Sequence, residues 1–88
     1  MGRRVLFSGR VQGVGFRFTT CDVAKAFAVT GYVKNLLGGR VELVCEGSRE
    51  ETVKFIDAVY SAMHNYIGEM QSSEVPWTGE YRDFGVQV

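Results

Sequence analysis

The first element that the chain predicts is a strand near its N-terminus. Val5, Phe7 and Val11 alternate with arginine and serine residues, and an alternation of period two is typical of a strand that buries one face. We expect this strand to run for roughly eight residues.

A short amphipathic helix is expected after the glycine-rich segment at residues 9–15. Apolar or small residues recur there with the period of a helix, while Asp22 and Lys25 fall on the opposite side. The buried stripe is predicted to contain Thr20, Val23, Ala24, Phe27 and Ala28. Gly31 is expected to end this helix.

A β-hairpin is predicted over residues 32–46. Its two runs, YVKNLL and RVELVCE, are separated by Gly38-Gly39, and a glycine pair readily adopts the positive φ angles of a tight turn. Alternate residues of the second run should face opposite sides of the sheet, one of them the core. These are Val41, Leu43 and Cys45 on one side, and Glu42 and Glu46 on the other.

The second helix has the clearest signals. Ser48 and Glu51 have the spacing of a capping box, in which each side chain satisfies a free backbone N–H group. The helix is expected over residues 49–64, with a buried stripe of Val53, Ile56, Val59, Tyr60 and Met63. Residues 65–74 show no clear period, whereas VPWTGEY predicts an edge strand that carries Pro76, and FGVQV a short terminal strand.

The order of these elements predicts the fold class. A β-α-β-β-α-β order within 88 residues is typical of an α+β sandwich of the ferredoxin-like kind. Such a sandwich has one antiparallel sheet with both helices on one face, and a short extra C-terminal strand can be added to it. We expect residues 1–88 to form a single domain.

Composition and charge exclude several classes of function. Ten Lys and Arg residues balance ten Asp and Glu residues, so the chain lacks the basic field of a typical nucleic-acid-binding protein. The apolar run at the N-terminus is too short for a signal peptide, and no run is long enough to span a membrane. We expect a cytoplasmic monomer with no nucleic-acid or membrane partner.

Cysteine and histidine positions argue against a metal site. Cys21 and Cys45 are far apart, no C-x-x-C motif is present, and His64 is the only histidine. The two cysteines are expected to be reduced thiols; the alternative is a disulfide, which needs an oxidising compartment. His64 is expected at the surface, near the C-terminus of the second helix.

The segment GRVQGVGFRF, residues 9–18, is the first candidate for chemistry. Its glycines let backbone N–H groups approach a ligand, and the helix start adds further N–H donors that favour an anion. Arg17 can offer two N–H donors to phosphate oxygens. The spacing fits neither G-x-x-x-x-G-K-[ST] nor G-x-G-x-x-G, so these residues alone leave open both a plain turn and an anion cradle.

Two motifs resemble those of a known family. The segment Val11-Gln12-Gly13-Val14-Gly15-Phe16-Arg17, with Gly9 ahead of it, resembles the acylphosphatase signature G-x-V-Q-G-V-x-F-R. Thr20 matches a threonine that often follows the signature arginine by three positions. Residues 30–35 resemble the second signature of the family, G-W-V-x-N, with Tyr32 in place of tryptophan.

The resemblance implies hydrolysis of an acyl phosphate to a carboxylate and inorganic phosphate, without cofactor or metal. It implies that Arg17 binds the phosphate and that the side-chain amide of Asn35 holds the attacking water. Thr20 is expected to support the loop. The backbone N–H groups implied in phosphate binding are those of Gln12, Gly13, Val14, Gly15 and Phe16.

The sequence leaves two other functions open. The glycine and aromatic residues of RVQGVGFRF are faintly similar to a base-stacking strand motif, against which the neutral charge argues. A regulatory domain that binds a phosphorylated metabolite without hydrolysing it would use the same cradle. The acyl group of the substrate is not encoded in either motif, so acetyl phosphate, carbamoyl phosphate and 1,3-bisphosphoglycerate all remain open.

Overall fold

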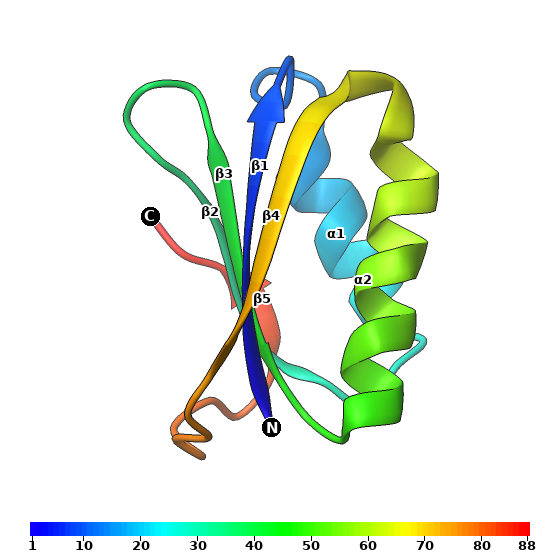
Figure 1. The fold of residues 1–88 in the computed structure, drawn as a ribbon, viewed down its shortest axis with the longest axis vertical. Helices are drawn as coiled ribbons and strands as arrows, with labels where there is room; N and C mark the ends of the chain where they lie inside the picture. Colours follow the sequence, from blue (N-terminus) through cyan, green and yellow to red (C-terminus); the bar gives the residue numbers. More distant parts are fainter.

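The computed structural model describes residues 1–88, and its two helices cover one face of a five-stranded sheet (Figure 1). The strand order is β4-β1-β3-β2-β5, in which four strands are antiparallel and β5 pairs with β2 in parallel. The ferredoxin-like fold is confirmed, and so is the extra C-terminal strand. The elements are β1 (Gly2–Gly9), α1 (Phe16–Ala24), β2 (Thr30–Asn35), β3 (Val41–Glu46), α2 (Arg49–Met63), the 3-10 helix η1 (His64–Tyr66), β4 (Ile67–Val75) and β5 (Phe84–Val86).

The sheet topology brings two distant segments to the same end of the molecule. Both β1 and β2 pair with β3 in the antiparallel sense, so β1 and β2 run in the same direction. The loop that follows β1 and the last residue of β2 therefore lie together, at the upper end of the sheet in Figure 1.

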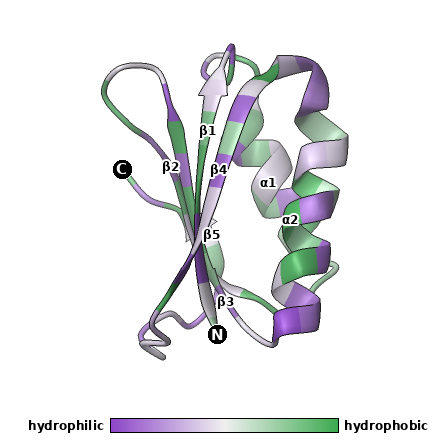
Figure 2. Cartoon of the chain, in the orientation of Figure 1, coloured by the Kyte–Doolittle hydropathy of each residue, from purple (hydrophilic) through white to green (hydrophobic).

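The core lies between the helices and one face of the sheet. Alternate strand residues such as Val5, Phe7 and Val33 are fully buried there, as the period of two predicts. Helix α2 begins where the capping signal predicts, since the Ser48 side chain accepts a hydrogen bond of 3.1 Å from the backbone N–H of Glu51. Figure 2 shows hydrophilic residues in the first turn of α2. Neither helix has the length and apolarity needed to cross a membrane.

Helix α1 is shorter than predicted, because it ends at Ala24 and leaves Phe27 and Ala28 outside it. After Ala24 the backbone bonds tighten from i−4 to i−3 spacing, as in the bond from the N–H of Phe27 to the carbonyl of Ala24. Phe27 still packs against Phe55, with ring centroids 6.0 Å apart. The apolar period therefore continues although the helix does not. Gly31 does not end the helix but lies inside β2.

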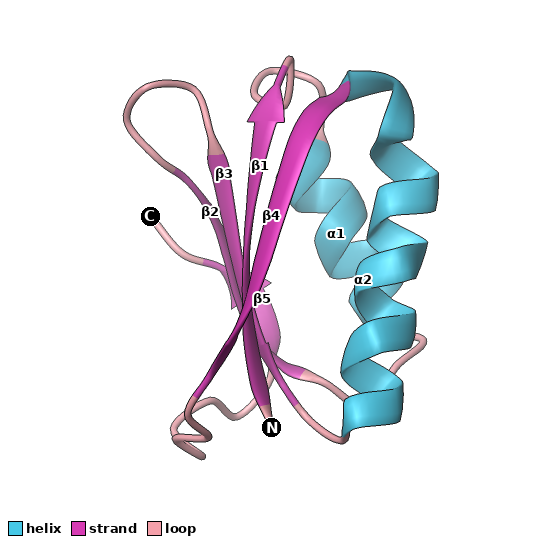
Figure 3. Cartoon of the chain, in the orientation of Figure 1, coloured by secondary structure: helices cyan, strands magenta, loops and turns pink.

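The last third of the chain differs most from the prediction. Strand β4 occupies residues 67–75, where no period was visible, and residues 76–83 form a loop instead of the expected edge strand (Figure 3). The reason is that β4 is an edge strand with almost all of its side chains exposed, so no alternation of apolar and polar residues is required. The loop lies at the end of the sheet opposite the β1–α1 loop.

Two glutamates of β3 are buried on the sheet face that carries no helix. Glu46 is 2% exposed and accepts hydrogen bonds from the Thr78 N–H (2.9 Å), the Thr78 hydroxyl (2.7 Å) and the Gly79 N–H (3.0 Å). Glu42 is held by Arg4 at 2.7 Å and by the hydroxyl of Tyr32 at 2.8 Å. The expectation that both lie opposite the apolar face is correct, but they are covered by other side chains and by the 76–83 loop.

We expect Glu46→Gln to destabilise the protein and to weaken the dependence of its stability on pH. Burial alone would raise the pKa of Glu46, but the hydrogen bonds from Thr78 and Gly79 outweigh this and hold the pKa below its usual value. Such a carboxylate stabilises the fold above its unfolded-state pKa of about 4.3, and this contribution is lost as the pH falls through the folded-state pKa. In the variant, the NH2 group of the glutamine side chain would face the hydrogen-bond donors of Thr78 and Gly79, and a donor facing a donor costs about 1–3 kcal/mol at pH 7.

Urea unfolding at a series of pH values measures both effects. Glu74→Gln on the exposed part of β4 is the matched control and should leave the free energy of unfolding within about 0.5 kcal/mol of the wild type. An unchanged pH dependence in Glu46→Gln would show that this carboxylate is not linked to folding.

We also expect Gly31→Ala to be strongly destabilising. Gly31 has a φ of 138°, and a Cβ atom at this position would overlap the carbonyl oxygen of Val44 on the paired strand. Strands β2 and β3 would have to separate, so the loss should exceed about 3 kcal/mol. Gly38→Ala is the control, because its φ of 92° is also positive but no atom lies within 4 Å of the added carbon. Equal losses in the two variants, measured by thermal or urea unfolding, would contradict the close approach of the strands.

Candidate active site

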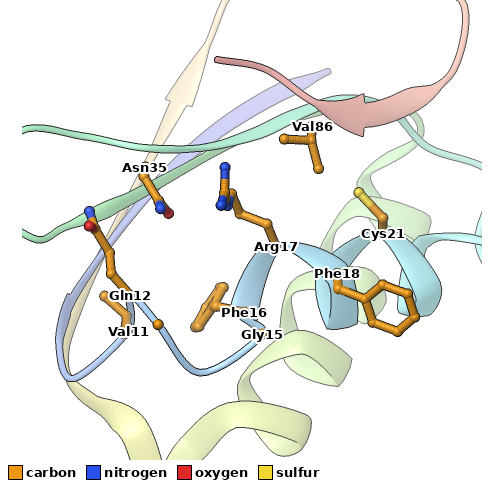
Figure 4. Close-up of a pocket in the computed structure, with 10 residues that line it drawn as sticks. Val11, Gln12, Gly15, Phe16, Arg17, Phe18, Cys21, Asn35 and Val86 are labelled. Carbon is orange, nitrogen blue, oxygen red and sulfur yellow. The ribbon is translucent and has the colours of Figure 1, made fainter.

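The main pocket lies where the β1–α1 loop meets the end of β2 (Figure 4). It has a volume of about 440 Å³. Its walls come from the loop, the start of α1, the last residue of β2 and the end of β5. The lining residues are Val11, Gln12, Gly13, Gly15, Phe16, Arg17, Phe18, Cys21, Asn35 and Val86.

The loop that lines this pocket contains a row of backbone N–H groups without partners in the chain. No backbone N–H group from Val11 to Phe18 donates a hydrogen bond within the chain, and the first N–H group of the helix that does so is that of Thr19, to the Gly15 carbonyl at 2.9 Å. Gly13 and Gly15 both have a φ of 78°, and a Cβ atom at either position would meet no protein atom within 4 Å. The donors are therefore unshielded, and a negatively charged group suits them.

Side-chain and backbone bonds fix the first part of this loop. The side-chain amide of Gln12 donates to the carbonyl oxygens of Leu36 and Arg40, each at 2.9 Å, which ties the loop to the turn after β2. The backbone N–H of Arg10 donates to the Tyr66 carbonyl at 2.9 Å. Gln12 thus holds the loop through its side chain, a role that the sequence did not suggest.

The strand register aims Asn35 at the loop. Val41 of β3 pairs with Phe7 of β1 on one side and with Asn35 of β2 on the other, so Asn35 lies two strands, or about 10 Å, from Phe7. Asn35 is two residues after the fully buried Val33 and so shares its face of the sheet. Because Asn35 is the last residue of β2, its amide lies beyond the covered core.

Arg17 and Asn35 project into the same pocket (Figure 4). Arg17 is the second residue of α1, and its side chain forms no ion pair with any carboxylate of the chain. The side-chain amide of Asn35 also lacks a hydrogen-bond partner within the chain. The structure therefore brings together a free cation, a free amide and a row of free backbone donors.

The other residues that the sequence predicted for the site contact the interior of the protein. Phe16 is 2% exposed and packs on Phe7, with ring centroids 4.9 Å apart, so it forms the floor of the pocket. Val14 does not line the pocket but packs against the core. Thr20 is fully buried, and its hydroxyl donates to the Phe16 carbonyl at 2.8 Å, which supports the first turn of α1.

No group of three His, Cys, Asp or Glu side chains in the chain could hold a metal ion. His64 is exposed at the end of α2, where its Nδ1 lies 3.1 Å from the carbonyl of Ser61, and it does not line the pocket. Cys21 and Cys45 are both free. The chemistry of the pocket therefore depends on a guanidinium, an amide and backbone N–H groups.

Four pocket residues were not among the site residues predicted from the sequence, namely Val11, Phe18, Cys21 and Val86. Phe18 could have been found, because it is a large apolar residue that does not fall on the buried stripe of α1, which contains Phe16, Thr20 and Ala24. Val86 gave no signal, because its place in the pocket depends on the pairing of β5 with β2.

Comparisons with known proteins agree with this geometry. The family model "Acylphosphatase" matches residues 3–86. An acylphosphatase of Roseiflexus sp. (strain RS-1) is 40% identical over 85 residues, which span 93% of this chain and 89% of the relative. The crystal structure of acylphosphatase from Bacillus subtilis has a TM-score of 0.87 at 29% identity, over 99% of this chain and 98% of that chain. T. kodakarensis HypF has a TM-score of 0.84 at 32% identity and matches all of this chain with 12% of its own length. The chain therefore belongs to the acylphosphatase family and is a hydrolase that acts on acid anhydrides.

Proposed function

We propose that residues 1–88 act as one acylphosphatase domain in which Arg17 and the loop hold the phosphoryl group and Asn35 positions the attacking water. The observation that carries the proposal is the pocket itself, in which the free Arg17 and Asn35 side chains meet the unpaired N–H groups of residues 11–18. The expected loop ligands are the N–H groups of residues 12–16.

The charge of the substrate explains why such a site suffices. Phosphoryl transfer proceeds through a loose transition state whose charge is spread over the phosphoryl oxygens, so positioning and electrostatic stabilisation do most of the work. The guanidinium of Arg17 supplies a fixed positive charge with paired N–H donors, and the loop supplies donors that need no reorganisation.

The hydrolytic step requires no covalent contribution from the protein. The oxygen of water attacks phosphorus, the bond from phosphorus to the bridging oxygen breaks, and the acyl group leaves as a carboxylate. A phosphoryl oxygen takes the proton of the water, so a neutral amide at Asn35 is enough to orient the nucleophile. A carboxylate leaving group needs no general acid, which fits a pocket without histidine, aspartate or glutamate.

We propose that this domain works as a cytoplasmic monomer without metal and without a nucleic-acid partner. The two free cysteines fit a reducing compartment, and the zero net charge argues against nucleic-acid binding. Hydrolysis of benzoyl phosphate in the presence of a chelator tests the metal-free reaction. Binding of phosphate without any turnover would instead favour a regulatory, phosphometabolite-binding domain.

Arg17→Gln is expected to weaken both hydrolysis and inhibition by inorganic phosphate. Loss of one charged hydrogen-bonding partner costs about 1.5–3 kcal/mol, so the inhibition constant of phosphate should rise by roughly 10- to 100-fold. Arg49→Gln is the matched control, since Arg49 is an exposed arginine in the first turn of the other helix. Unchanged phosphate inhibition in Arg17→Gln would remove Arg17 from the phosphate site.

Asn35→Ala is expected to lower kcat by about a hundredfold or more and to leave phosphate inhibition near the wild-type value. A poorly positioned nucleophile loses rate without losing ground-state binding. Steady-state kinetics with inorganic phosphate as competitor measures both quantities, and Asn65→Ala at an exposed site in η1 serves as the control. Parallel loss of turnover and phosphate binding would show that Asn35 is a ligand of phosphate and not of water.

A further inference from the structure

The pocket has an apolar half that the phosphate chemistry does not use. Phe18, Cys21 and Val86 line it, and each comes from a different turn or strand. In Figure 4, Asn35 lies on one side of the Arg17 side chain, whereas these three residues lie on the other side. The geometry of the proposed reaction indicates what this apolar half binds.

In a phosphoryl transfer the attacking and leaving oxygens lie roughly in line, on opposite sides of phosphorus. If Asn35 holds the water and Arg17 holds the phosphoryl group, the leaving acyl group must point away from Asn35. That direction leads to Phe18, Cys21 and Val86 in Figure 4. The positions of the catalytic residues therefore predict where the acyl group lies.

The exposure of these residues is unusual for their size. Phe18 is 76% exposed and Val86 is 51% exposed, although both are large and apolar. Phe18 lies off the buried stripe of α1 and contributes nothing to the core. Exposed apolar side chains that gather around a concave site are typical of ligand contacts.

The pocket is also larger than a phosphoryl group needs. Its volume is about 440 Å³, whereas a phosphoryl group displaces about as much as three or four water molecules, or roughly 100 Å³. Arg17 is the only charged residue among the ten that line the pocket. Burial raises the pKa of the Cys21 thiol, so this side chain is an uncharged part of the wall. None of the three residues on the apolar side is charged, and Lys25, whose charge acts on the Cys21 thiol, does not line the pocket.

Resting on the proposed function, we propose that Phe18, Cys21 and Val86 form the binding site for the acyl group. The enzyme is then selective for acyl phosphates whose acyl group is bulky, uncharged and apolar, such as an aromatic or branched aliphatic carboxylate. Small or charged acyl groups would leave the Phe18 and Val86 side chains in contact with water and would gain no binding energy there.

The first test is a ratio of specificity constants. We expect the ratio of kcat/KM for benzoyl phosphate to kcat/KM for acetyl phosphate to fall about tenfold in Phe18→Ser. A tenfold effect corresponds to lost contact over roughly 50–60 Å² of apolar surface. Comparing ratios between variants removes the difference in intrinsic reactivity of the two substrates. Phe18→Leu should keep the ratio within about threefold of the wild type, because the apolar contact is mostly retained.

Leu37→Ser is the matched control, because Leu37 is 99% exposed and does not line the pocket. Its ratio should equal that of the wild type. An equal ratio in the wild type, Phe18→Ser and Val86→Thr would overturn the proposal.

A second test does not depend on turnover. Phosphonates cannot be hydrolysed at the bond between carbon and phosphorus, so their binding can be measured by calorimetry. We expect the wild type to bind benzylphosphonate more tightly than methylphosphonate. In Phe18→Ser the ratio of the two dissociation constants should be about tenfold closer to one. No preference in the wild type would overturn the acyl site, even if both acyl phosphates are hydrolysed. A preference without any hydrolysis would support the apolar site and refute the proposed function.

Discussion

The site depends on the double pairing of β3. Because β1 and β2 flank it in the antiparallel sense, the strand that leads into the loop and the strand that ends at Asn35 are parallel to each other. The residue pairs at Val41 set the register on both sides, and a slip by one residue would turn Asn35 to the opposite face of the sheet. The closeness of the strands at Gly31 contributes to this register, and β5 uses β2 as its only neighbour. The pairing of β1, β3, β2 and β5 therefore positions the loop, the Asn35 amide and the apolar residues of the pocket together.

The residues that stabilise the fold and the residues proposed for catalysis lie in different parts of the sheet. The apolar core lies under the helices. The buried Glu46 network lies at the lower end of the sheet, where the loop at residues 76–83 closes over β3. The upper end contains unpaired backbone donors and exposed apolar side chains, neither of which stabilises the folded chain. A site of this kind persists only when the rest of the structure holds it in place, and here the bonds of Gln12 and Arg10 do so.

Much of this architecture could be predicted from the sequence, since the fold order and the position of α2 follow from local signals. The meeting of Arg17 with Asn35 was implied only by the resemblance of two motifs to those of the acylphosphatases. The end of α1 could not, because Phe27 keeps the helical apolar period while its backbone bonds follow i−3 spacing. Strand β4 was invisible because an exposed edge strand needs no alternation. The burial of Glu46 depends on Thr78, 32 positions away, and that contact requires the fold itself. Val86 reaches the pocket for the same reason.

The loop also shows why a row of unpaired donors is compatible with a stable fold. An N–H group that is buried without a partner costs about 1–3 kcal/mol, but Gly13 and Gly15 leave the donors beside them open to water. The phosphoryl oxygens of a ligand would exchange this water for charge-assisted bonds. The loop is already held at Arg10 and Gln12 and would lose little conformational entropy. Replacing either glycine by a residue with a side chain would strain the backbone at a φ of 78° and shield the donors at the same time. The glycines therefore serve the conformation of the loop and the access of the ligand together.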